Sequence, residues 1–80
     1  MIVKPLTTEK AIRLIELENV ISFEVDSRMN KSEIKKEFNK LFKAKIIKIN
    51  TQNKGSKKIA YIKLDEKTPA IDIATSVGII

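Results

Sequence analysis

The segment between Phe38 and Leu64 contains eight lysines and no carboxylate, and it also shows the pattern of two β-strands. Its lysines are Lys40, Lys43, Lys45, Lys48, Lys54, Lys57, Lys58 and Lys63. Strands give a segment a defined shape, so this charge is not that of a disordered tail. We therefore predict a shaped cationic surface, and the commonest partner of such a surface is a nucleic-acid backbone.

The charge is unevenly distributed along the chain. Its 80 residues include 16 basic and 10 acidic side chains, which gives a net charge of +6. Residues 31–63 hold eleven lysines against two glutamates, whereas the remainder is mildly acidic. A surface that serves only solubility mixes the two signs, which favours a binding surface. A general lysine bias of the proteome is the second interpretation of the same charge.

The composition excludes several classes of function. The chain has no cysteine and no histidine, which removes disulfides, the usual metal ligands and the usual general base. With only two glycines it cannot form a glycine-rich phosphate loop. We therefore predict that the protein is not an enzyme and has no cofactor and no metal site. The apolar runs are short, so we expect no membrane segment and no secretory signal.

Helix and strand signals alternate in the first half of the chain. Thr7 or Thr8 is placed to cap a helix that runs to about Glu18, and we expect Asn19 to end this helix in the left-handed conformation. Residues 20–26 alternate apolar and polar side chains, which predicts a half-buried strand. The first residues of the chain suggest a further short strand.

A second helix and a β-hairpin follow. Asn30 and Glu33 have the spacing of a capping box, and the helix that they begin should end near Lys43. Residues 45–51 and 57–64 have the composition of strands, joined by a loop of about five residues. In the last helix, Thr68 is the expected cap and Pro69 the first helical residue.

These elements predict an α+β fold in one domain that spans residues 1–80. The order is (β)αβαββα, with a small antiparallel or mixed sheet packed against helices in a ferredoxin-like-related arrangement. A β-α-β crossover joins strand 20–26 to strand 45–51.

The two faces of the hairpin differ in chemistry, because side chains alternate along a strand. One face would carry Lys45, Ile47, Ile49, Thr51, Lys58, Ala60, Ile62 and Leu64, and the other Ile46, Lys48, Asn50, Ile59, Tyr61 and Lys63. On the second face Tyr61 could stack on a base while Asn50 forms hydrogen bonds. Alternatively, Tyr61 only covers the sheet beneath a helix.

Several fragments, in order, resemble a known family. They are Thr7–Ala11, Phe23–Val25, Asn30–Lys35, Leu41–Phe42, Asn50–Asn53, Gly55–Lys58, Ala60–Leu64 and the closing Ala70, Ile73, Ala74, Val77 and Gly78. Together they cover nearly the whole chain. The chain is similar to the universal large-subunit ribosomal protein twenty-three family, in its archaeal form.

The resemblance implies a structural protein of the large ribosomal subunit, in the cytoplasm, that binds 23S-type rRNA at the outer rim of the polypeptide exit tunnel. It also implies a neighbouring ribosomal protein, number twenty-nine, and a docking platform for nascent-chain factors such as the signal recognition particle. In bacterial relatives the glutamate equivalent to Glu9 takes part in docking a chaperone. We expect the free protein to be a monomer.

The candidate site residues are chosen from the charge and strand pattern together with the family resemblance. For rRNA binding they are Lys4, Lys10, Lys48, Asn50, Thr51, Lys54, Lys57, Lys58, Tyr61 and Lys63, and for protein docking Glu9, Glu16 and Glu18. The alternative function is a protein-interaction or regulatory module with a ferredoxin-like sheet, in which the lysines only discourage aggregation at strand edges.

Overall fold

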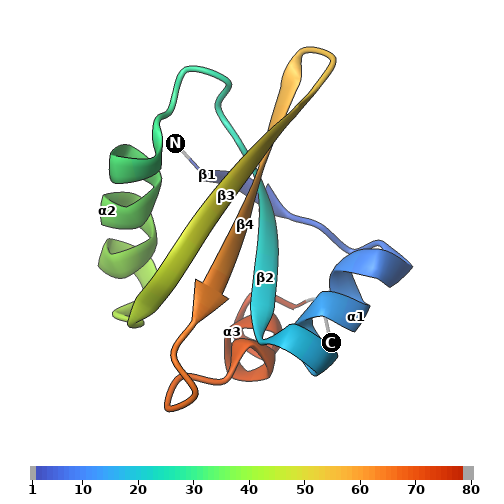
Figure 1. Cartoon of the computed structure of the whole chain (residues 1–80), viewed down its shortest axis with the longest axis vertical. Coiled ribbons are helices and arrows are strands. Elements are labelled where there is room, and N and C mark those ends of the chain that lie inside the picture. The colour runs from blue at the N-terminus through green and yellow to red at the C-terminus, as the bar shows by residue number, and fades with distance from the viewer. Residues whose placement is uncertain (1, 79–80) are drawn as a thin grey trace.

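The computed structural model describes residues 2–78, and its elements follow the predicted order (Figure 1). The strands are β1 (Ile2–Pro5), β2 (Val20–Val25), β3 (Ile46–Lys54) and β4 (Lys57–Leu64). The helices are α1 (Glu9–Glu18), α2 (Lys31–Phe42) and α3 (Ala70–Ser76). The predicted α+β class is confirmed, and the sheet is antiparallel throughout rather than mixed.

Strand β4 lies inside the sheet, whose strand order is β1-β2-β4-β3. Both β2 and β3 pair antiparallel with β4, so they run parallel to each other with β4 between them. Helix α2 connects these two strands. This is the split β-α-β arrangement of ferredoxin-like sheets, and it makes β4 the strand that joins the two halves of the sheet.

The core lies on the face of the sheet that α2 and α3 cover. Three phenylalanines meet there, Phe23 of β2 with Phe38 and Phe42 of α2. The ring centroids of Phe38 and Phe42 are 4.9 Å apart, and that of Phe23 is 5.8 Å from Phe38. Ile62 of β4 and Ile73 of α3 complete the same cluster. All three phenylalanines therefore serve packing, as the sequence predicted, and none is available for stacking on a base.

A β-bulge reverses the predicted faces at the start of β3. The pairing with β4 shifts register between Ile46 and Lys48. Ile46 lies opposite Leu64 and packs against the core, whereas Ile47 is 59% exposed. The prediction had these two isoleucines the other way round and is wrong here, because a bulge inserts a residue that simple alternation does not count.

The hairpin turn is tighter than predicted. Strand β3 extends to Lys54, which pairs with Lys57, so only Gly55 and Ser56 form the turn. Gly55 has a φ of +63°, as a glycine in the first position of a type II′ turn requires. The predicted five-residue loop is wrong, because its polar residues continue the ladder instead of leaving it.

Two of the three predicted N-terminal helix caps are confirmed. The Thr8 side chain accepts a hydrogen bond from the Ala11 N–H at 3.2 Å. Asn30 and Glu33 form the capping box, with bonds of 2.9 and 3.1 Å. The predicted Thr68 cap of α3 is wrong, because Pro69 occupies the cap position and has no capping side chain.

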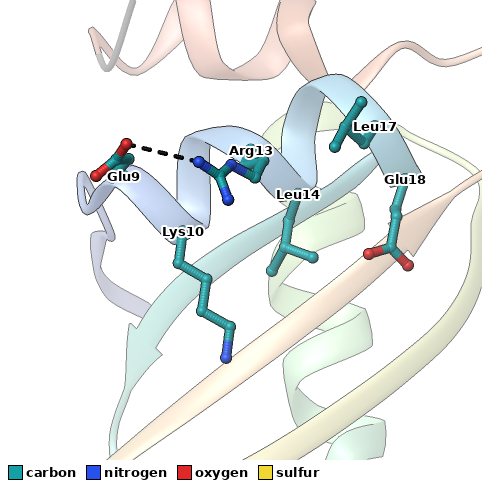
Figure 2. A pocket seen from close by; sticks show the side chains of 6 residues that line it. All are labelled: Glu9, Lys10, Arg13, Leu14, Leu17 and Glu18. Atoms are coloured by element: carbon teal, nitrogen blue, oxygen red, sulfur yellow. Dashed lines mark ion pairs between the residues drawn. The ribbon is translucent and has the colours of Figure 1, made fainter.

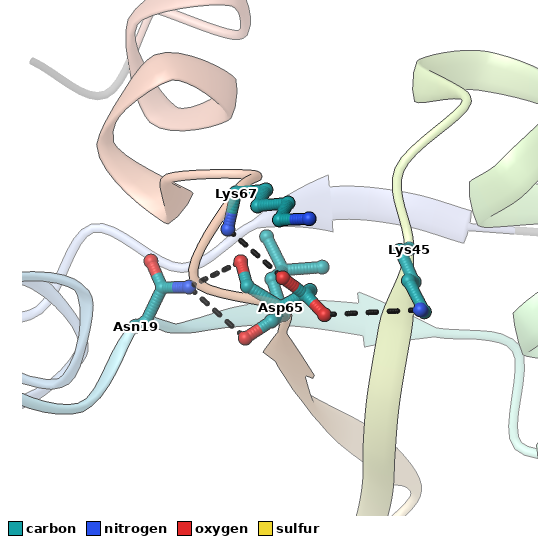
Figure 3. Close-up of polar contacts among 5 residues, drawn as sticks. Asn19, Lys45, Asp65 and Lys67 are labelled. Carbon is teal, nitrogen blue, oxygen red and sulfur yellow. Dashed lines mark hydrogen bonds and ion pairs between the residues drawn. The ribbon is translucent and has the colours of Figure 1, made fainter.

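A side chain from elsewhere in the chain caps α3 instead. Asn19 Oδ1 accepts from the Ala70 N–H at 2.6 Å, and its Nδ2 donates to the carbonyl oxygens of Leu64, Asp65 and Thr68 at 3.0–3.3 Å. Figure 3 shows the amide beside Asp65, whose carboxylate lies 3.9 Å from the Lys45 amine. With a φ of 55°, Asn19 also ends α1. One residue thus joins α1, the end of β4 and the start of α3.

We predict that Asn19→Gly lowers the free energy of unfolding by about 2 kcal/mol, because the hydrogen bonds of the side chain are removed. Asn19→Ala should cost about 1 kcal/mol more, since alanine is strained in the left-handed conformation. Urea denaturation of the three proteins measures both effects. A glycine variant as stable as the wild type would contradict the role assigned to the amide.

Candidate nucleic-acid interface

The second face of the sheet presents polar side chains from three adjacent strands. Strand pairing places Ser22, Tyr61 and Asn50 in one row across β2, β4 and β3. The next row along the strands contains Glu24, Ile59 and Gln52. Beyond the first row Lys63 lies opposite Lys48, and beyond the second Lys57 lies opposite Lys54. This face is therefore bordered by lysines at both ends.

Helix α1 forms one wall of this face. Lys10, Leu14 and Glu18 are four residues apart, so they form one stripe of the helix. Figure 2 shows the three side chains extending from α1 across the strands. Ala11 and Ile15, on the adjoining stripe, are buried. The same helix thus anchors itself with one stripe and borders the open sheet face with the next.

Two adjoining hollows lie between α1 and the open sheet face. Their volumes are about 260 Å³ and about 420 Å³, and both are lined by Lys10, Leu14 and Tyr61. The smaller reaches Lys4 and the hairpin turn, and the larger reaches Lys48 and Lys63 at the opposite end of the face. We call the two hollows together the lysine trough.

Eight of the ten predicted rRNA-binding residues line the lysine trough. They are Lys4, Lys10, Lys48, Asn50, Lys54, Lys57, Tyr61 and Lys63. Lys4 and Lys10 come from β1 and α1, far in sequence from the lysine-rich segment, and the fold brings them to the same surface. The structure therefore gathers most of the candidate residues along one open surface, as a polyanion-binding interface requires.

Thr51 and Lys58 do not join this group. Thr51 pairs with the fully buried Ala60 and lies on the core face of the sheet. Lys58 is half-buried on that same face, where its amine donates a hydrogen bond of 2.6 Å to the Met29 carbonyl oxygen. Although Lys57 and Lys58 are neighbours in sequence, alternation places them on opposite faces of the sheet.

Most amines of the lysine trough form no ion pair with a described carboxylate, so they are available to bind an anion. In the part of the chain that the structure describes, Lys57 forms an ion pair with Glu24 at 3.8 Å. Lys48, Lys54 and Lys63 are exposed and form no ion pair with any described residue. Lys45 pairs with Asp65 outside the trough. The lysine-rich segment is thus divided, and about half of its amines contribute to the trough.

Tyr61 has a fixed position in the middle of the trough. Its hydroxyl donates a hydrogen bond of 3.2 Å to Gln52 Oε1, and its side chain is half-buried. It lies beside Leu14 of α1, so the helix does shield part of the ring, in line with the alternative interpretation. Sequence reasoning missed Gln52 because it assigned this residue to the turn; the continuing alternation after Asn50 was the available signal.

Two of the predicted docking residues, Glu9 and Glu16, lie on the outer surface of α1, whereas Glu18 borders the lysine trough. Glu9, Glu16 and Glu18 are all exposed, and Glu9 forms an exposed ion pair with Arg13 at 3.6 Å (Figure 2). Leu17 lies among them and is 75% exposed. An acidic helix with an exposed leucine is a different kind of surface from the lysine trough.

Neither a metal centre nor a membrane span is found among residues 2–78. No group of three or more acidic, histidine or cysteine side chains is clustered there. None of the helices within the same residues is long and apolar enough to cross a membrane.

Fold and trough together define a small basic α+β domain whose open sheet face suits a polyanion. The family is identified by comparison with known proteins. Residues 1–74 match the model of the family Ribosomal protein L23, and the chain belongs to that family. This confirms the resemblance predicted from the sequence fragments. Because members of this family are structural components, membership also supports the prediction that the protein is not an enzyme.

Two curated relatives illustrate the match. Large ribosomal subunit protein uL23 of Trypanosoma brucei brucei is 47% identical over 78 residues, which cover 95% of this chain and 47% of the relative. Large ribosomal subunit protein uL23 of Methanothermobacter thermautotrophicus is 39% identical over 80 residues, which cover 99% of this chain and 93% of the relative. The chain therefore spans about half the length of the trypanosome protein and nearly all of the archaeal one.

The different positions of neighbouring lysines lead to a stability prediction. Lys58→Ala should lower the free energy of unfolding by about 1 kcal/mol, because the partly buried bond to the Met29 carbonyl is removed. Lys54→Ala, at an exposed position of the same hairpin, should change it by less than about 0.5 kcal/mol. Equal effects in urea denaturation would contradict the separation of the two faces.

Proposed function

We propose that this protein is a structural component of the large ribosomal subunit and binds 23S-type rRNA as a single domain through the lysine trough. Family membership and the names of the uL23 relatives support the ribosomal assignment. The observation that carries the binding mode is the convergence of six lysines from β1, α1, β3 and β4 on one open surface. The cytoplasmic large subunit is the corresponding location.

Phosphate contacts supply most of the affinity in this mechanism. Each lysine that neutralises a phosphate releases a condensed counterion, so binding weakens as the salt concentration rises. Asn50, Gln52 and Tyr61 lie between the two lysine-bordered ends and would set the register against folded RNA.

Strand pairing holds the backbone on the hairpin side of the trough. Strand β4 is paired on both sides, and the tight turn at Gly55 and Ser56 leaves no long loop to be ordered on binding. A preorganised surface loses less conformational entropy when a complex forms. The lysine side chains still lose rotamer freedom, so the fixed backbone reduces this cost without removing it.

Salt-dependent binding tests the proposal. We expect log affinity for a large-subunit rRNA fragment to fall linearly with log salt concentration. Lys48→Gln with Lys63→Gln should weaken binding and reduce the magnitude of the slope by about two, because two phosphates are no longer neutralised. Filter binding or fluorescence anisotropy at several salt concentrations measures both quantities.

The matched control is Lys35→Gln with Lys36→Gln, which removes the same charge from exposed positions on α2. This pair should leave the slope almost unchanged. If the two double variants behave alike, net charge rather than the trough determines binding, and the proposed interface is wrong.

We further propose that the protein lies at the outer rim of the polypeptide exit tunnel, beside ribosomal protein number twenty-nine, and helps to dock nascent-chain factors such as the signal recognition particle. The family resemblance motivates this placement. The exposed carboxylates and Leu17 on the outer surface of α1 support it, because they lie outside the RNA-facing trough or at its border.

A second pair of variants tests the docking surface. Glu9→Gln with Glu16→Gln should reduce the affinity of the signal recognition particle for assembled large subunits severalfold, because rim charges steer association. Glu37→Gln on α2 is the control and should have no effect. Unchanged co-sedimentation of the factor with subunits that carry the double variant would contradict the docking role.

A further inference from the structure

The smaller hollow of the trough contains a carboxylate that phosphate binding does not explain. Glu24 lies in its wall together with Lys4, Lys10 and Lys54, and its side chain is 17% exposed. Its one ion pair in the described structure is with Lys57, at the long distance of 3.8 Å. A carboxylate beside an incoming phosphate is repulsive. Its position therefore indicates a partner group that donates hydrogen bonds.

Ser22 lies next to Glu24 on the same strand. The Ser22 side chain is on the same face of β2 and also lines the smaller hollow, although only 1% of the residue is exposed. Its hydroxyl has no hydrogen-bond partner among the described residues. That oxygen is itself buried, so an incoming group can reach Glu24 but not this hydroxyl.

The remaining walls suit a flat aromatic group. Tyr61 lies opposite Ser22 in the strand pairing, and its bond to Gln52 fixes the position of its ring. Leu14 and Ile59 supply apolar surface beside it. The volume of about 260 Å³ is below the usual range for drug-sized ligands, which suits one planar ring system. The lysines that line this hollow are positioned to bind the phosphates on either side of such a group.

We propose that this hollow holds the base of one unpaired guanosine of the bound RNA. Glu24 accepts hydrogen bonds from the guanine N1–H and N2–H groups, and Tyr61 stacks on the ring. The inference rests on the proposed RNA-binding function and adds a base-specific contact to it.

Guanine fits the carboxylate better than the other bases do. It alone offers two adjacent N–H donors on its Watson–Crick edge, which match the two oxygens of a carboxylate. In adenine and cytosine the amino group adjoins an acceptor nitrogen, and in uracil carbonyl oxygens flank the single N–H. Each of these acceptors would be repelled by Glu24. Recognition of splayed-out bases by stacking and edge contacts is the usual way in which proteins read single-stranded RNA.

Three nine-residue oligouridylates test the inference with the full chain. One has a central guanosine, one a central inosine, which lacks the N2 amino group, and one only uridine. Since all three present the same phosphates, differences in affinity report the base alone. We expect the guanosine oligonucleotide to bind about tenfold more tightly than the other two, in the range of one bidentate base contact.

The variant Glu24→Gln separates two effects of the carboxylate, which are the repulsion of RNA phosphates and the recognition of guanine. The variant should bind the all-uridine oligonucleotide more tightly than the wild type, because a repulsive charge is gone. The ratio of its affinities for the guanosine and inosine oligonucleotides should fall to nearly one. Glu37→Gln, on α2 and outside the trough, should leave both quantities unchanged, and circular dichroism confirms that each variant is folded.

Two results would overturn the inference while leaving the proposed function intact. One is salt-dependent binding of all three oligonucleotides with equal affinity. The other is binding of an rRNA fragment without measurable binding of any oligonucleotide. If neither the rRNA fragment nor the oligonucleotides bind, the proposed function itself is wrong.

Discussion

The pairing of β4 with both β2 and β3 is the interaction on which the rest of this structure depends. It brings three strands into one pleated surface, and the pleat sends alternate side chains of β4 to opposite faces. Ala60 and Ile62 are buried in the core on one side, while Tyr61 and Lys63 line the trough on the other. Burial of the first set therefore fixes the register that presents the second, because a one-residue slip would exchange the two faces.

The trough is assembled from parts that are distant in sequence. Asn19 joins the end of α1 to the end of β4 and the start of α3, and so holds α1 at the border of the sheet. This position places Lys10 beside Tyr61 and opposite the lysines of the hairpin. A lysine-rich segment alone would give an extended cationic strand pair; the helix converts it into a walled surface in which a carboxylate and a buried hydroxyl also have a defined place.

Much of this arrangement follows from the sequence, because local patterns control it. Three predicted features depend only on residues that are close in sequence, and the structure agrees with all of them. They are the alternation in residues 20–26, the capping box at Asn30 and the left-handed conformation of Asn19. The bulge after Ile46 and the capping of α3 by Asn19 depend on tertiary partners, which a linear pattern does not contain. The candidate site shows the same limit. Alternation predicted the faces of Lys48, Asn50 and Tyr61, whereas the association of Lys4 and Lys10 with them is a product of the fold.

The most direct test of the central claim is lysine acetylation of the protein, free and assembled in large subunits, with mass spectrometry of each modified site. In the free protein the exposed amines of Lys48, Lys54 and Lys63 should react as readily as those of Lys35 and Lys36 on α2. On assembly the trough lysines should become strongly protected, while the α2 lysines change much less. Equal reactivity of the trough lysines in both states would contradict the claim that this face of the sheet lies against RNA.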